Sequence, residues 1–223
     1  MRIDDVWEES TRVLRLARRS DRCTVLGPGV RAVLWVQGCV FRCPGCVVDE
    51  MLPFHGGHEV EIDALADELA SLPDIEGVTF SGGEPFSQAL ALSMLIDRIR
   101  SRREMSYMSY TGYTLEDLEE RGMPAQRSLL SRLDILVDGP YVASRHTDLR
   151  WRGSDNQRVV FISDRYRHLK PRLAERGYAL EFEFPADGSV QWMGIPPRYF
   201  RADLQSSLAA LGIELAPEQE GEG

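Results

Sequence analysis

The 223-residue sequence has no apolar run approaching the ~20 residues that a membrane-spanning helix needs. Its first nine residues include four acids, which is not expected of a secretory signal peptide. Basic residues are outnumbered, because 26 Lys and Arg face 35 Asp and Glu and leave a net charge of −9. A general nucleic-acid binder needs a basic footprint instead. We therefore expect a cytoplasmic protein that binds neither membrane nor nucleic acid.

Cysteine is also scarce, yet three of the four cysteines fall within residues 39–46. In a reducing compartment a disulfide is the less favoured interpretation, and clustered cysteines indicate metal or redox chemistry. Cys23 stands apart and is most simply a small buried or half-exposed residue. Hydrophobic residues make up 43% of the chain, which is enough to fill a core and excludes a wholly disordered protein.

Short β-like runs alternate with amphipathic helical runs over most of the chain. The clearest strands are 33–36, 78–80, 135–137 and 159–162. Apolar residues at helical spacing predict helices around 62–69 and 92–99. Thr114, with Asp117 three residues later, predicts the start of a short helix. This alternation favours a parallel sheet with helices packed outside it.

The pattern changes after residue 165. Residues 178–184 alternate strictly between apolar and polar, and Asp187-Gly188 then suits a hairpin turn before a second strand at 190–193. A final helix would carry an apolar face made of Phe200, Leu204, Leu208 and Leu211. We therefore expect a core at 13–164, an extension at 165–215 and a disordered acidic tail at 216–223.

The cysteine loop follows directly on the first of these strands. Cys39, Cys43 and Cys46 are spaced so that three thiolates on one tight loop can each bind one iron of a cubane [4Fe–4S] cluster. The fourth iron then has no protein ligand and is open to a small molecule. Zinc is the alternative, because Cys43 and Cys46 with His55 and His58 make an ordinary Cys2His2 set. The zinc set leaves Cys39 unused, so the cluster is the favoured interpretation.

A second motif, Ser81-Gly82-Gly83-Glu84, ends the strand at 78–80. Paired glycines let the backbone approach a ligand closely, and bare amides are hydrogen-bond donors. The Glu84 carboxylate could accept from an ammonium group. Alone, this turn is equally an ordinary loop between a strand and a helix. One β–α unit after the cysteine loop, it becomes a strong signal for a bound cofactor.

These motifs together resemble the radical S-adenosylmethionine (SAM) superfamily and, within it, the activating proteins of anaerobic ribonucleotide reductase. The resemblance runs over most of residues 13–162. Its motifs are Gly27–Arg31, Gly38–Cys46, Ser81–Pro85, Thr111–Tyr113, Leu136–Gly139 and Trp151–Arg158. Two features depart from the family: Val47 stands where an aromatic residue is common, and about 60 residues follow the last motif.

The resemblance implies an α/β fold that is a partial (β/α) barrel of radical SAM type, with an appended C-terminal β-hairpin and helix. It implies that Cys39, Cys43 and Cys46 ligate the cluster at the carboxyl ends of the strands. The residues implied to bind SAM are Gly45, Val47, Ser81, Gly82, Gly83 and Glu84. Candidate contacts of SAM or of a partner are Thr111, Asp138, Arg152 and Asn156.

The implied activity is reductive cleavage of SAM at the [4Fe–4S] cluster to a 5′-deoxyadenosyl radical. That radical would generate a glycyl radical on a partner similar to anaerobic ribonucleotide reductase, with flavodoxin or ferredoxin as electron donor. No side chain is expected to be catalytic itself, because the cofactors carry the chemistry. One alternative is a stand-alone radical SAM enzyme acting on a peptide or small molecule. The other is a non-catalytic zinc-binding module.

Overall fold

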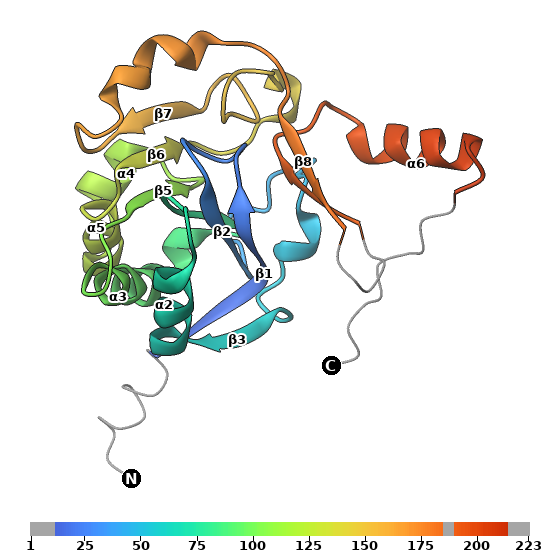
Figure 1. Ribbon diagram of the computed structural model, residues 1–223. Helices are drawn as coiled ribbons and strands as arrows, with labels where there is room; N and C mark the ends of the chain where they lie inside the picture. Colours follow the sequence, from blue (N-terminus) through green and yellow to red (C-terminus); the bar gives the residue numbers. More distant parts are fainter. Residues whose placement is uncertain (1–11, 185–189, 214–223) are drawn as a thin grey trace.

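The computed structural model describes residues 12–184 and 190–213. Its centre is a seven-stranded mixed sheet with strand order β3-β1-β2-β4-β5-β6-β7 (Figure 1). The strands are β1 (Val13–Cys23), β2 (Arg31–Val36), β3 (His58–Glu61), β4 (Gly77–Gly82), β5 (Ser106–Tyr110), β6 (Ile135–Asp138) and β7 (Arg158–Phe161). The four strands predicted from the sequence are thus present, as β2, β4, β6 and β7.

The expectation of a parallel sheet is correct only for the middle of the sheet. Strands β2, β4, β5 and β6 are parallel, whereas β1 runs antiparallel to β2 and β3, and β7 runs antiparallel to β6. Parallel neighbours need a long crossover, usually a helix. The link between β1 and β2 is a short loop, and the link between β6 and β7 contains only a 3₁₀ turn, η3 (Ala143–Arg145). The fold is therefore α/β with a mixed sheet, whose strands in the described part of the chain do not close into a barrel.

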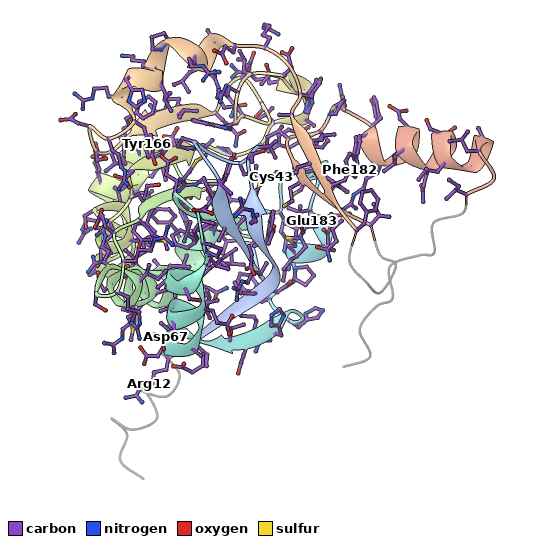
Figure 2. The ribbon with its side chains drawn as sticks, viewed as in Figure 1. Arg12, Cys43, Asp67, Tyr166, Phe182 and Glu183 are labelled. Atoms are coloured by element: carbon purple, nitrogen blue, oxygen red, sulfur yellow. The ribbon has the colours of Figure 1, made fainter. Side chains whose placement is uncertain are left out.

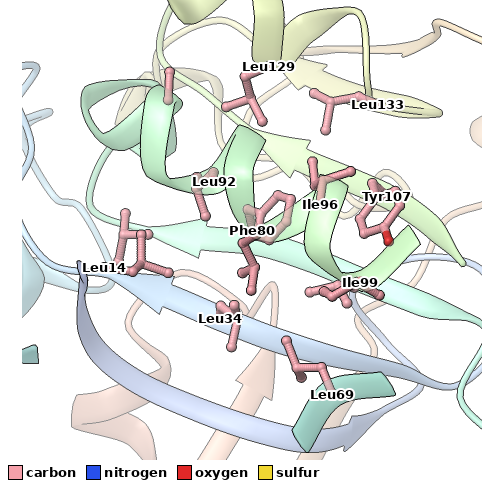
Figure 3. Close-up of a cluster of buried hydrophobic side chains, with 14 of the residues drawn as sticks. Leu14, Leu34, Leu69, Phe80, Leu92, Ile96, Ile99, Tyr107, Leu129 and Leu133 are labelled. Carbon is pink, nitrogen blue, oxygen red and sulfur yellow. The ribbon is translucent and has the colours of Figure 1, made fainter. Parts of the chain in front are cut away.

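Four helices pack together beside the sheet: α2 (Ile62–Ser71), α3 (Ala89–Arg100), α4 (Leu115–Glu120) and α5 (Pro124–Leu130) (Figure 1). As predicted, Thr114 caps α4, and its hydroxyl accepts from the Asp117 N–H at 3.2 Å. The main core lies between these helices and the sheet, where Phe80, Leu92 and Tyr107 are fully buried (Figure 3). Within the described ranges, no helix is both long enough and apolar enough to cross a bilayer.

The register of the parallel strands sets the position of the loops. Val36, the last residue of β2, pairs with Gly82, the last residue of β4. Tyr110, the last residue of β5, pairs with Val137 of β6. The carboxyl ends of these strands therefore meet at one edge of the sheet, where ligand sites form in open α/β sheets.

The predicted hairpin and final helix are both present. The hairpin pairs β8 (Leu180–Glu183) with β9 (Gln191–Gly194), and the helix is α6 (Phe200–Ala210). The predicted turn at Asp187-Gly188 and the predicted tail at 216–223 lie outside the described residues.

Polar contacts fasten the hairpin to β1 and the loop after it. Glu183 points from β8 towards the main sheet (Figure 2), and its carboxylate accepts from the Ser20 hydroxyl at 2.6 Å. The Glu181 carboxylate accepts from the Thr24 N–H at 2.7 Å. Helix α6 extends away from the sheet and buries none of its residues (Figure 1).

A core substitution tests the packing of this fold. We expect Phe80→Ala to lower the free energy of unfolding by about 3–5 kcal/mol, because a fully buried ring leaves a cavity. Phe184→Ala is the matched control, since Phe184 is 74% exposed and should change that free energy by no more than about 0.5 kcal/mol. Urea unfolding of the cluster-free protein measures both, and equal midpoints for the two variants would contradict the packing.

Candidate functional site

A cavity of about 910 Å³, counted with its solvent-filled mouth, opens at the carboxyl ends of the parallel strands. It brings together two of the predicted motifs. The cysteine loop contributes Cys39, Cys43, Cys46 and Val47, and the turn after β4 contributes Ser81, Gly82, Gly83 and Glu84. Thr111, after β5, also lines the cavity. Residues about forty positions apart in the chain thus face one space, because β2 and β4 are parallel and in register.

Backbone contacts hold the two loops against each other. The Glu84 N–H donates to the Gly38 carbonyl at 2.8 Å, and the Gly83 N–H donates to the Val36 carbonyl at 2.8 Å. A Cβ on Gly83 would lie 2.2 Å from the Gly38 oxygen. Only glycine allows so close an approach, so Gly83 is required for contact between the loops whatever it binds.

The cysteines have the chemistry that a metal centre needs. All four cysteines of the chain are free thiols, and of the three in the loop Cys39 is buried while Cys43 and Cys46 are half-buried. Burial raises the pKa of Cys43 and of Cys46, and the nearby Cys39 sulfur raises both further. Thiolates in such a place need a positive centre to compensate their charge, which an iron–sulfur cluster would supply.

The two cysteines and two histidines of the alternative zinc site lie in different surroundings. Cys43 and Cys46 line the cavity, whereas His55 and His58 are exposed and do not. Among residues 12–184 and 190–213, no three His, Cys, Asp or Glu side chains lie close enough to hold a single metal ion. The ligands of a cubane cluster lie farther apart than those of a single metal ion, since each thiolate binds its own iron.

Glu84 is tied to the protein more firmly than its sequence motif indicates. Its side chain is buried, with Oε1 accepting from the Phe86 N–H and the Thr111 hydroxyl, both at 2.9 Å. Oε2 accepts from the Gly112 N–H at 2.8 Å. A carboxylate has about four acceptor positions, so about one remains for a ligand. Burial raises the Glu84 pKa to about 7, although these three hydrogen bonds act in the opposite direction.

Four predicted residues do not line the cavity. The buried Asp138 carboxylate accepts from Arg158 Nε at 3.0 Å and from the Leu115 N–H at 2.8 Å. Arg152 and Asn156 donate to backbone carbonyls. Gly45 lies in the cysteine loop with φ +75°, which suits the turn there. Contact of these residues with a cofactor or partner stays a prediction.

Other residues that line the cavity lie outside the sequence motifs and were not predicted. Arg18 and Tyr110 come from β1 and β5, and Met193 and Ile195 come from the C-terminal extension. The face of a short strand is hard to read from sequence, and the hairpin follows the cysteine loop by some 150 residues. The alternation at 178–184 signalled a two-faced hairpin, but not which part of the molecule it covers.

The pH dependence of stability tests the burial of Glu84. An unfolded glutamate has a pKa near 4.5, and the folded value of about 7 means that the folded state holds the proton more tightly. Stability from this group is therefore full below about pH 4.5 and is lost as the pH rises through 7. Between about pH 4.5 and 7, we expect the free energy of unfolding of the cluster-free wild type to fall by on the order of 3 kcal/mol relative to that of Glu84→Gln. Parallel urea-unfolding curves for the two proteins at each pH would contradict this.

Comparison with known proteins identifies the fold's relatives. The model of the family described as "4Fe-4S single cluster domain" matches residues 25–160. The anaerobic ribonucleoside-triphosphate reductase-activating protein of Vibrio cholerae is 35% identical over 141 residues, which cover 60% of this chain and 88% of that protein. The protein of the same name from Enterobacteria phage T4 is 32% identical over 145 residues, covering 63% and 89%.

A further relative matches a smaller part of the chain. The pyruvate formate-lyase 1-activating enzyme of Escherichia coli is 39% identical over 71 residues, which is 30% of this chain and 29% of that enzyme. The family model agrees with the cavity, because residues 25–160 include the cysteine loop and the turn after β4. The two longer matches cover the greater part of the chain. The chain belongs to the family of anaerobic ribonucleoside-triphosphate reductase-activating proteins and contains that family's 4Fe-4S single cluster domain.

Proposed function

We propose that this chain is a radical SAM enzyme that generates a glycyl radical on a partner similar to anaerobic ribonucleotide reductase. Family membership implies its two cofactors, a [4Fe–4S] cluster and SAM. One observation carries the proposal: the three loop cysteines and the turn from Ser81 to Glu84 line the same cavity. The relatives are named for activating an anaerobic reductase or pyruvate formate-lyase, which supports a protein partner.

In this proposal Cys39, Cys43 and Cys46 hold three irons of the cluster. Gly82, Gly83 and Glu84, together with Ser81, hold the methionine end of SAM, and Gly45 and Val47 lie beside the cluster. When bound, the two cofactors supply one-electron cleavage of SAM and a carbon radical that abstracts hydrogen. The protein supplies orientation and exclusion of water.

The chain's own residues join the two loops that would hold the cofactors. The hydrogen bond from Glu84 N–H to the Gly38 carbonyl joins the turn to the cysteine loop. The Glu84 side chain joins the same turn to Thr111 and Gly112 after β5. Trp35 and Phe41 also line the cavity and limit the water that reaches a bound cofactor.

The core and the C-terminal extension would have different roles. We infer that residues 13–164 form a partial (β/α) barrel of radical SAM type, which is left open at one side, and that residues 165–215 are an added segment. The open side would admit a loop of the partner. Flavodoxin or ferredoxin is the proposed electron donor, and the cytoplasm the proposed location.

Removal of one cysteine tests the cluster. We expect Cys39→Ala to retain little iron after anaerobic reconstitution and to lose SAM cleavage, because a thiolate ligand is missing. Cys23→Ala is the matched control, since Cys23 is a buried free thiol that does not line the cavity. Iron and sulfide analysis with visible absorption measures retention. Full iron in Cys39→Ala, or stoichiometric zinc without iron in the wild type, would disprove the assignment.

A second experiment tests the substrate. Cluster-loaded enzyme, SAM and a reductant are incubated with and without an anaerobic ribonucleotide reductase from the same source. We expect the electron paramagnetic resonance signal of a glycyl radical only in the mixture that contains the reductase. A modified peptide or small molecule formed without any partner would instead support the stand-alone enzyme, an alternative favoured by the extension's contribution to the cavity wall.

A further inference from the structure

The cofactor cavity has a second wall, to which the proposed function assigns no ligand. Residues that line it also belong to one apolar cluster, which is separate from the main core: Leu26, Trp35, Val48, Tyr110, Met193 and Ile195. The thiols and the turn after β4 are polar, whereas this wall is made of aliphatic, thioether and aromatic groups. The cavity therefore offers two different chemistries to one ligand.

The C-terminal hairpin completes this wall. Trp192, Met193 and Gly194 of β9, and Ile195 after it, all line the cavity, and Met193 is only 1% exposed. The hairpin lies beyond residues 25–160, the part that matches the 4Fe-4S family model. The wall is thus built partly from a segment outside the family domain.

The hairpin is fixed in this position. Arg18 Nη2 donates to the Trp192 carbonyl at 3.1 Å, and its guanidinium lies 4.2 Å from the centre of the Trp35 ring. Arg18 lines the cavity as well, so this contact joins β1, β2 and β9 at the wall itself. With the carboxylates of Glu181 and Glu183 bonded to the β1 side, the hairpin is held at several points along its length.

We propose that this wall, closed by Met193 and Ile195 of the hairpin, binds the nucleoside half of SAM. The inference rests on the proposed function, which places the charged amino-acid half of SAM at the cluster and the turn after β4. The nucleoside half carries a flat aromatic base, and apolar and aromatic side chains bury such a surface favourably. The extension is accordingly part of the cofactor site.

Binding measurements on the full chain test this inference without turnover. Cluster-loaded, unreduced protein is equilibrated anaerobically with SAM and, separately, with methionine, which lacks the nucleoside. We expect Met193→Ala to weaken SAM binding roughly tenfold, since it removes apolar contact area, and to leave methionine binding unchanged. Met193→Leu restores most of the affinity because it refills the wall.

Two further variants separate a local effect from loss of the fold. Ile195→Ala tests the same wall at a half-buried position and should weaken SAM binding in the same direction. Phe182→Ala is the control on the same hairpin, because Phe182 is 39% exposed and does not line the cavity. Its SAM affinity should match the wild type. Thermal melting confirms that each variant is folded at the assay temperature.

The outcomes distinguish this inference from the function on which it rests. Unchanged SAM affinity in folded Met193→Ala and Ile195→Ala, with wild type that binds and cleaves SAM, overturns the nucleoside wall alone. Unchanged SAM affinity in these variants together with reduced glycyl radical formation also overturns the nucleoside wall, and indicates that the wall binds the partner protein instead. Equal weakening of SAM and methionine contradicts it as well. A wild type that binds no SAM overturns both proposals.

Discussion

The contact between the cysteine loop and the turn after β4 is the constraint on which the rest of the site depends. Parallel pairing of β2 with β4 brings Val36 beside Gly82, so the two strands end next to each other and their loops begin at the same edge of the sheet. The two loops then touch through backbone, with hydrogen bonds from Gly83 to Val36 and from Glu84 to Gly38. The absence of a Cβ at Gly83 is what makes this spacing sterically allowed.

Other features support that contact. The buried Glu84 carboxylate extends the arrangement to a third loop through Thr111 and Gly112, at a cost that appears as its raised pKa. Buried polar groups of this kind are tolerated when each has hydrogen-bond partners. Further away, the ion pair of Asp138 with Arg158 holds the edge strand β7 against β6 without entering the cavity. The Asp138–Arg158 pair thus supports the sheet beside the site, whereas Glu84 lines the cavity itself.

Sequence patterns predicted the parts of this structure that depend on local spacing. The cysteine spacing, the Ser-Gly-Gly-Glu turn, the Thr114 cap and the C-terminal hairpin are each set by residues close together in the chain, where physical rules are strongest. Strand β1 was not predicted, because it mixes buried Leu14 and Leu16 with the polar run from Arg18 to Arg22. Strand β7 was predicted, but not its antiparallel direction. Direction also depends on the connection, which a strand's own sequence does not encode.

The site shows the same limit. Motif spacing could bring Cys39 and Glu84 to one cavity, since both follow neighbouring strands. Motif spacing could not show that Asp138 stays out of the cavity. Its carboxylate accepts a hydrogen bond from Arg158, which lies twenty residues later in the chain. Nor could motif spacing place Met193 on the cavity wall, because that position depends on how the hairpin docks against β1. Long-range packing, which no local pattern records, decides both.

We propose that three cysteines hold a four-iron cluster and leave one iron for SAM. Mössbauer spectroscopy of protein reconstituted with ⁵⁷Fe, recorded before and after SAM is added, examines each iron separately. We expect four irons per cluster, one of which changes its signal when SAM binds while the other three do not. Spectra that stay the same for all four irons, or a protein that holds no iron, would contradict it.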